Sequence, residues 1–137
     1  MKIRLFFIAV LFSFFGISQN ELQTIEIDEL SEVPVYPGCE NIRNKRKCLQ
    51  ENIQRHIVRN FKYPKQAKKN KIQGRVFVQF IVGTGGYIDV IKTRGPNDLL
   101  EKEAQRIISL LPKFKPGVLN GKTVRVPFSM PIIFKLR

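Results

Sequence analysis

Two apolar runs joined by a glycine-rich turn constrain the fold of this chain most strongly. The first run, residues 75–82, is mostly β-branched and aromatic, and it has apolar residues on both faces at Phe77 and Ile81. The second run covers residues 87–94, and the sequence GTGG at 83–86 separates the two. Glycine readily adopts the positive φ that hairpin turns require. The pattern predicts an antiparallel β-hairpin whose first strand lies in the centre of a sheet.

An amphipathic helix is expected before the hairpin. Leu49, Ile53 and Ile57 recur every four residues, with polar residues on the other faces. His56 lies beside this apolar stripe, and we expect it to be partly exposed on the helix surface. Pro64 then breaks the helix, because it disfavours helical geometry at the preceding residue. It suits the first turn of a new helix, which is short and very basic.

A second amphipathic helix is expected after the hairpin. Asp98 is the predicted cap, with Glu101 as its reciprocal partner, and Pro112 ends the helix. One face of this helix is apolar and consists of Leu100, Ala104, Ile107, Ile108 and Leu111. This face predicts the main core helix.

The last apolar segment predicts an edge strand. Within it Val124, Val126, Phe128 and Met130 alternate with Thr123, Arg125, Pro127 and Ser129. Proline cannot donate to a sheet ladder, so Pro127 is expected at an edge with its missing N–H directed outward. Arg125 and Ser129 are expected to offer donors on the same side, which gives a ladder with one gap. Pro131 is expected to interrupt the strand before residues 132–134 resume pairing.

Together these elements predict an α+β domain, with a three-stranded antiparallel sheet and two helices packed on one face of it. The expected order is helix, strand, strand, helix, strand. About a hundred residues are available to this part of the chain, which is enough for one small core.

The order of these signals resembles the C-terminal domain of TonB, a periplasmic protein that reaches outer-membrane receptors. The matching motifs are Tyr63-Pro64, residues 73–80, Gly85-Gly86, the helix that ends near residue 111, the Phe114-Lys115-Pro116-Gly117 corner and the last apolar strand. The resemblance covers residues 34–136. Phe114 stands where the family commonly has a tryptophan, which keeps an aromatic side chain and removes an N–H donor.

The resemblance implies a site for an extended peptide. In the TonB family the final strand receives the TonB box, the N-terminal motif of the receptor, by β-strand addition. The residues implied for partner binding are Tyr63, Pro64, Thr123, Val124, Arg125, Val126, Pro127, Phe128 and Ser129. For Tyr63-Pro64 a second interpretation stays open, in which the pair is a helix-breaking corner with Tyr63 packed beneath it.

The implied function is a periplasmic module that binds the TonB box or plug region of outer-membrane TonB-dependent transporters, in support of energy-dependent uptake. A separate inner-membrane energy-transducing complex is a further expected partner. The alternative is a soluble cell-envelope adaptor or scaffold of the same fold, which binds another protein or an anionic glycan and does not transduce energy. A third hypothesis is a homodimer that forms through the last strand.

The N-terminal sequence predicts export. Lys2 and Arg4 precede an apolar run of residues 5–17, which predicts a signal peptide over residues 1–18 with cleavage after Ser18. The run is short for a membrane anchor, which needs about 20 residues; an inner-membrane anchor remains the alternative if the segment is not cleaved. The expected location is the periplasm.

Charge divides the exported chain into two parts. Residues 19–33 hold five acidic residues and no lysine or arginine, which predicts an acidic tether before a domain at residues 34–137. The tether reaches about 50 Å when fully extended, so by itself it does not bridge an envelope. The domain holds 22 Lys and Arg against 6 acidic residues. In an exported protein this charge favours acidic proteins, glycans or lipid headgroups over nucleic acid.

Cys39 and Cys48 are the only cysteines, and in an oxidising compartment they predict a disulfide. His56 is the only histidine, and no nucleophile has a recognisable general base in the sequence. We therefore expect neither catalysis, nor a metal site, nor a cofactor.

Overall fold

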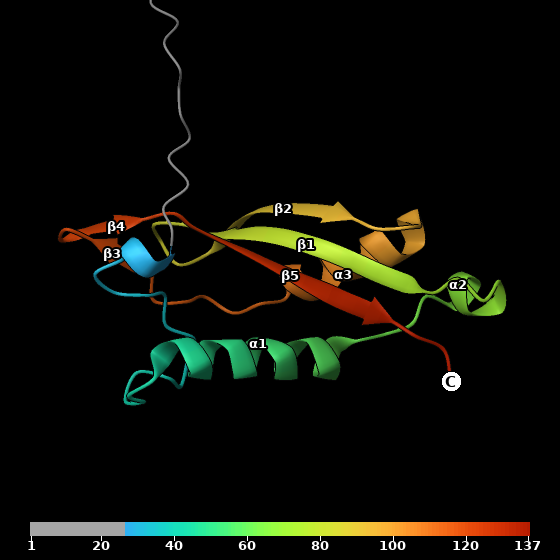
Figure 1. The fold of residues 1–137 in the computed structure, drawn as a ribbon, viewed down its shortest axis with the longest axis horizontal. Helices are drawn as coiled ribbons and strands as arrows, with labels where there is room; N and C mark the ends of the chain where they lie inside the picture. The colour runs from blue at the N-terminus through green and yellow to red at the C-terminus, as the bar shows by residue number, and fades with distance from the viewer. Residues whose placement is uncertain (1–26) are drawn as a thin grey trace, which may run out of the picture.

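The computed structural model describes residues 27–137 (Figure 1). The expected signal peptide and residues 19–26 of the expected tether lie outside these residues. The elements in chain order are η1 (Ile27–Glu29), α1 (Lys45–Asn60), α2 (Lys65–Lys69), β1 (Gly74–Val82), β2 (Ile88–Arg94), α3 (Asp98–Ser109), β3 (Gly117–Leu119), β4 (Lys122–Val124) and β5 (Val126–Phe134). No helix among the described residues is long and apolar enough to cross a bilayer.

The main sheet has three antiparallel strands in the order β2-β1-β5. This confirms the predicted α+β class and the central position of the first strand. Alternate residues of β1 point into the core and are fully buried, namely Val76, Val78, Phe80 and Val82. Between β1 and β2, Gly83 N–H donates to the Tyr87 carbonyl and closes the predicted hairpin at 2.8 Å.

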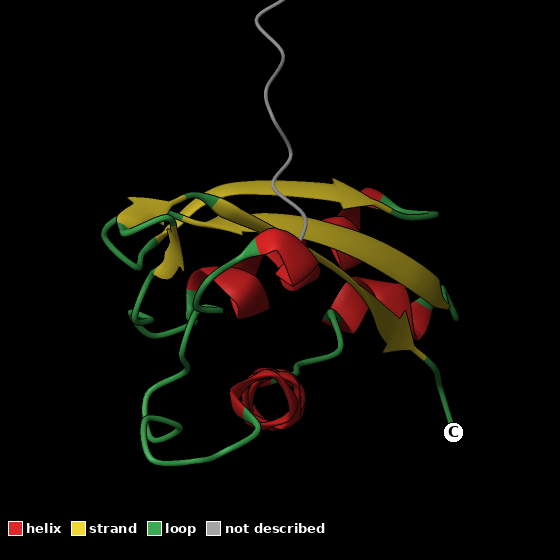
Figure 2. Cartoon of the chain, turned by 60° about the vertical axis from the view of Figure 1, so that its left-hand side comes forward, coloured by secondary structure: helices red, strands yellow, loops and turns green. Residues whose placement is uncertain are grey.

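The helices lie on one face of this sheet, as the sequence predicts. Figures 1 and 2 show α3 beneath the strands and α1 on the same side, farther from the sheet. Leu49 and Ile53 of α1 join Leu100 and Ile107 of α3 in the core. The opposite face of the sheet is open, and Phe77 on it is 49% exposed.

His56 is buried, so its predicted position on the helix surface is wrong. Its Nε2 lies 2.7 Å from the Ile107 carbonyl, and its Nδ1 lies 3.3 Å from the Asn60 side-chain nitrogen. Since a carbonyl only accepts, Nε2 carries the proton, and Nδ1 is free to accept from the Asn60 amide. The apolar spacing of α1 did not reveal this contact, because it depends on where α3 ends.

The cap of α3 also differs from the expectation. Asn97 is the N-cap, and its side chain accepts from Leu99 N–H at 2.8 Å. Asp98 is the first helical residue instead of the cap. Glu101 accepts from Gly95 N–H at 2.8 Å, so it satisfies the turn before the helix.

The residues predicted to form one edge strand are divided between two strands. Thr123 and Val124 belong to β4, which pairs with β3 in a separate hairpin closed at Asn120 and Gly121. Arg125 separates this hairpin from β5, which runs without a break to Phe134. The strand predicted over residues 123–130 therefore begins too early and ends too early. It begins too early because the tight turn at Asn120 and Gly121 pairs Thr123 and Val124 with β3 instead.

A disulfide joins Cys39 and Cys48, as the sequence predicts. Cys39 is fully buried and Cys48 lies in the first turns of α1, so the bond holds the preceding loop against this helix. Asn52, one turn later, donates to the Cys48 carbonyl at 2.8 Å. These contacts fix the N-terminal half of α1.

Candidate functional site

The outer edge of β5 is open. β1 pairs with β5 along one side from Gly74 to Val82, and no described strand pairs with its other side. β2 forms the other edge of the sheet, beside α3, where Gln105 donates to the Thr93 hydroxyl at 3.0 Å. Of the two edges, β5 is the one that borders the groove between this strand and α1.

Two prolines set the pattern of hydrogen-bonding groups on this edge. In an antiparallel pair, alternate residues direct their N–H and C=O toward the partner strand or away from it. Pro127 and Pro131 share one alternate set of the register with Ser129 and Ile133. Because proline lacks an N–H, this set is the one directed outward. The edge thus offers four carbonyls but only two N–H donors, those of Ser129 and Ile133.

The structure corrects three details expected from the sequence. Pro131 lies inside β5 and does not interrupt it, because its missing N–H faces away from β1. The ladder has two gaps, not one. Arg125 lies before β5, so its backbone adds no donor within the strand. Its guanidinium contacts the Asp89 carboxylate at 3.4 Å.

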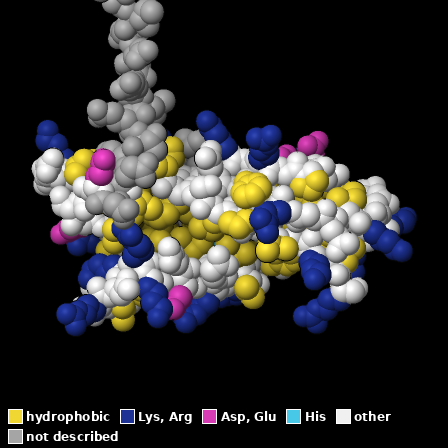
Figure 3. Space-filling view, in the orientation of Figure 1, with side chains coloured by type: hydrophobic (Ala, Val, Ile, Leu, Met, Phe, Trp, Pro, Cys, Tyr) yellow, Lys and Arg dark blue, Asp and Glu magenta, His cyan; other side chains and the backbone are white. Residues whose placement is uncertain are grey.

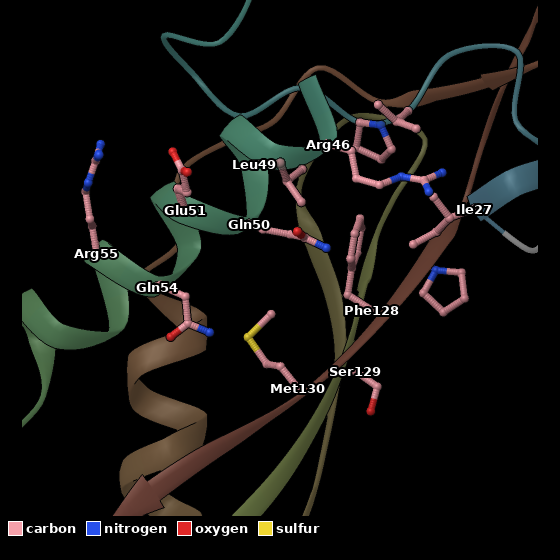
Figure 4. A pocket seen from close by; sticks show the side chains of 13 residues that line it. Ile27, Arg46, Leu49, Gln50, Glu51, Gln54, Arg55, Phe128, Ser129 and Met130 are labelled. Carbon is pink, nitrogen blue, oxygen red and sulfur yellow. The ribbon is translucent and has the colours of Figure 1, made fainter. Parts of the chain in front are cut away.

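A groove of about 890 Å³ lies between β5 and α1. Figure 4 shows Phe128 and Met130 of β5 directed toward α1, with Leu49 and Gln54 across from them. Figure 3 shows hydrophobic side chains gathered in the middle of this face. Its full lining is Ile27, Val33, Pro34, Arg46, Leu49, Gln50, Glu51, Gln54, Arg55, Pro127, Phe128, Ser129 and Met130.

The groove floor is held in place by the core. The ring of Phe128 stacks on the buried ring of Phe80, with centroids 5.4 Å apart. Leu49 is only 3% exposed, and the next turn of α1 is anchored by Ile53. Because Phe80 and Ile53 are themselves fixed in the core, these contacts hold the floor of the groove in place. The rim is charged, with Arg55 and Glu51 on the outer side of α1.

Tyr63 and Pro64 lie at the far end of β5. The Tyr63 ring packs edge-on against Phe134, with centroids 5.9 Å apart, and its hydroxyl donates to the Ile72 carbonyl. Burial raises the pKa of Tyr63. Phe134 is seven residues from Pro127, or about 23 Å along a strand. The structure therefore does not bring Tyr63-Pro64 into the groove, although one extended peptide along β5 would span both.

A charged cluster fixes the corner that leads to Tyr63. Nε and Nη2 of Arg106 donate to the two oxygens of the Glu103 carboxylate, at 2.9 and 2.6 Å. This hydrogen bonding raises the pKa of Arg106. Glu103 also accepts from the Lys62 backbone N–H at 3.0 Å. The cluster joins α3 to the break between α1 and α2, so its role is structural.

Sequence reasoning missed the groove residues on α1. The periodicity of the sequence places Leu49 in the core stripe and Gln50 and Gln54 on the polar faces of the helix. The only sequence feature that could have indicated these residues is their position at the border between the apolar stripe and the polar face of the helix. That position does not predict that β5, about 80 residues later, lies opposite them.

Comparisons with known proteins find one family and several solved structures to which this chain is similar. The family model described as Gram-negative bacterial TonB protein C-terminal matches residues 59–136. The solution structure of the Helicobacter pylori TonB C-terminal domain is similar, with a TM-score of 0.52 at 28% identity over 64% of this chain and 80% of that one. The Pseudomonas aeruginosa TonB C-terminal domain has a TM-score of 0.45 at 29% identity over 56% of this chain and 78% of that one. No curated protein matches the chain.

The family match contains β1, β2, α3 and all of β5, but it begins at Arg59, near the end of α1. The edge strand thus belongs to the matched region, whereas most of α1 and the disulfide precede it. From the fold and from a family match over more than half of its length, the chain belongs to the TonB C-terminal domain family.

Proposed function

We propose that this protein is a periplasmic module that binds the TonB box or plug region of outer-membrane TonB-dependent transporters by β-strand addition, in support of energy-dependent uptake. The observation that carries the proposal is the open edge of β5 beside a groove with an apolar floor. The family match and the similarity to a TonB C-terminal domain support the class of partner. Export to the periplasm through the N-terminal signal sequence is part of the proposal.

The edge and the groove suit an extended peptide because they recognise different parts of it. A strand that is added to β5 receives hydrogen bonds from Ser129 and Ile133 N–H and donates to the outward carbonyls. Its side chains alternate between the two faces of the sheet. Those on the helix side point toward Phe128 and Met130, which favours apolar residues at every second position.

The energy source is a separate matter. The proposal assigns energy transduction to an inner-membrane complex that acts on or through this module. The module itself supplies binding. The proposal includes no catalytic residue, since the chemistry of the site is that of backbone hydrogen bonds and apolar contacts.

Ser129 offers a matched pair of variants to test the proposal. Ser129→Pro removes one of the two outward donors, and β5 already contains proline at two positions of the same alternate set, so the fold should be retained. Ser129→Ala keeps the N–H and serves as the control. Affinity for synthetic N-terminal peptides of outer-membrane receptors from the same cell is measured by titration.

We expect Ser129→Pro to weaken peptide binding about tenfold, given roughly 0.5–1.5 kcal/mol for a lost hydrogen bond and the added cost of an unpaired carbonyl. Ser129→Ala should bind like the unmodified chain. Equal affinity of all three proteins would exclude pairing at the middle of β5.

The basic surface favours a second candidate, an envelope adaptor that binds an acidic protein or an anionic glycan without transducing energy. The part of the chain from Pro34 carries 22 Lys and Arg against 6 acidic residues. Salt separates the two functions. At about 0.3 M salt the screening length falls to about 6 Å, so binding by surface charge should largely disappear, whereas strand addition should persist.

A further inference from the structure

Five lysines lie within ten residues at one end of the molecule. They are Lys62, Lys65, Lys68, Lys69 and Lys71, and we call them the polybasic tip. All five are exposed, and residues 62–71 contain no acidic residue. Figure 1 places α2 at the end of the molecule opposite the β3-β4 hairpin, and Figure 3 shows Lys and Arg side chains around that end.

The backbone beneath the tip is fixed. Ala67 in the middle of α2 is fully buried, which turns the lysines on both sides of it outward. Ile72 N–H donates to the Ala67 carbonyl at 2.8 Å, and the Tyr63 hydroxyl donates to the Ile72 carbonyl. The lysine positive charges therefore project from a rigid corner.

Among the described residues, none of the five lysines of the tip is held in an ion pair. Glu103, the carboxylate that accepts from the Lys62 backbone, is already paired with Arg106. Residues 62–71 themselves contain no carboxylate, so the positive charges of the five lysines add up.

The end of β5 adds two more cations beside the tip. Phe134 pairs with Gly74 at the start of β1, and Leu136 N–H donates to the Gln73 side chain at 2.7 Å. These bonds hold Lys135 and Arg137 near the turn that follows α2. Both side chains are exposed.

The chemistry of the tip fits a surface of many anions. Lysine is a compact, hydrated point charge on a flexible stem, whereas the planar fork of arginine selects single carboxylates or phosphates. The nearby aromatic rings of Phe61 and Tyr63 pack against Phe134, so they offer no exposed platform for a base or a sugar. Clusters of four to eight basic residues bind anionic lipid surfaces, and each basic residue strengthens the binding constant about fivefold.

We propose that the polybasic tip docks on a membrane surface that carries anionic phospholipid headgroups. The groove residues of β5, Pro127 to Met130, lie about 13 to 23 Å along the strand from Phe134. Docking at the tip therefore leaves the middle of the edge accessible. The inference stands on the lysines alone and does not require the peptide function.

The test measures binding of the chain that begins at Gln19 to sedimenting vesicles. One set contains phosphatidylcholine with about 30% phosphatidylglycerol, and the other contains phosphatidylcholine alone. The tip variant combines Lys65→Gln, Lys68→Gln, Lys69→Gln and Lys71→Gln. The control variant removes four exposed charges elsewhere with Lys92→Gln, Lys102→Gln, Lys115→Gln and Lys122→Gln. Circular dichroism verifies the fold of each.

We expect binding only to the anionic vesicles, with at least a tenfold loss in the tip variant and less than threefold in the control. Equal losses in the two variants would mean unspecific attraction by net charge and would overturn the proposal. Equal binding to both vesicle types would overturn it too, as would complete displacement by a soluble acidic polysaccharide at equal charge. Peptide affinity of the tip variant in solution should be unchanged, which separates this result from a failure of the proposed function.

Discussion

At the scale of single residues, the number of N–H donors on the outer edge of β5 depends on which positions are proline. Pro127 and Pro131 delete two of four outward donors, and Ser129 and Ile133 retain the others. The same deletions disfavour a homodimer through the last strand. In any antiparallel pairing of two β5 edges, the proline positions leave about half of the possible N–H donors missing. Dimerisation itself stays a prediction from the sequence.

Gly86 illustrates how one residue fixes the corner beside the hairpin. Its φ is +87°, and a Cβ at this position would lie 1.9 Å from the Phe114 carbonyl oxygen. Phe114 N–H donates to the Gly86 carbonyl at 2.9 Å, so the two segments are in direct contact. The buried Phe114 ring packs edge-on against Tyr36, which keeps an aromatic plug at this corner, as expected.

Gly86→Ala is expected to destabilise the fold by about 3 kcal/mol or more, because strain from φ adds to the clash. Gly121→Ala is the control, since its φ is +78° and nothing lies within 4 Å of the added Cβ. We expect it to cost about 1 kcal/mol. Urea unfolding measures both, and similar costs would show that Phe114 does not constrain Gly86.

Tyr63 gives the fold a dependence on alkaline pH. Burial raises its pKa above 10.0 in the folded state, so the unfolded chain loses this proton first. The contribution of Tyr63 to stability is full below pH 10 and is lost as pH rises through the raised pKa.

Tyr63→Phe should cost about 1 kcal/mol at pH 8, through loss of the hydrogen bond to Ile72, and should remove this part of the alkaline decrease. Tyr87→Phe, at a side chain that is 61% exposed, is the control. Urea unfolding at pH 8 and near pH 10.5 tests both variants. An unchanged alkaline slope in Tyr63→Phe would contradict the assignment.

At the scale of elements, α1 and β5 matter most because the groove lies between them. The core stripe Leu49, Ile53 and Ile57 holds α1 to α3, and the His56 contact with the Ile107 carbonyl adds a polar link. The disulfide between Cys39 and Cys48 restrains the start of α1, next to the residues that line the groove.

Replacing both cysteines, as Cys39→Ser with Cys48→Ser, is expected to lower the free energy of unfolding by about 2–3 kcal/mol, the value for closing so short a loop. Urea unfolding with and without reductant measures the effect. Reductant should destabilise the unmodified chain and leave the double variant unchanged. A loss below about 0.5 kcal/mol would mean that the bond does not restrain the fold.

Local sequence patterns predicted the helices and strands in which buried residues recur at the period of the element, every second residue in a strand or every three to four in a helix. The alternation of residues 75–82 indicated β1, and the apolar face with Leu100 and Ile107 indicated α3. The same patterns did not reveal the β3-β4 hairpin, because three-residue strands are too short for a period to be seen. They also joined Thr123 to the edge strand, since alternation does not show which neighbour a strand pairs with.

At the scale of the whole molecule, the two candidate surfaces lie apart. The groove is formed by segments far apart in sequence, so only the fold reveals it, whereas the lysines of α2 were visible as a very basic helix. The charge of the domain could be counted, but its concentration at one end depends on the buried Ala67 and on the pairing of Phe134 with Gly74. Together the two proposals describe a module that would face a membrane and hold an extended peptide at once.

The most direct test of the central claim is amide hydrogen exchange followed by NMR during titration with receptor N-terminal peptides. In the free protein, Ser129 and Ile133 direct their N–H groups to solvent, and Thr93 does so on the opposite edge. The account predicts that the peptide slows exchange at Ser129 and Ile133 and leaves Thr93 unchanged. Binding without protection at Ser129 and Ile133 would contradict strand addition at β5.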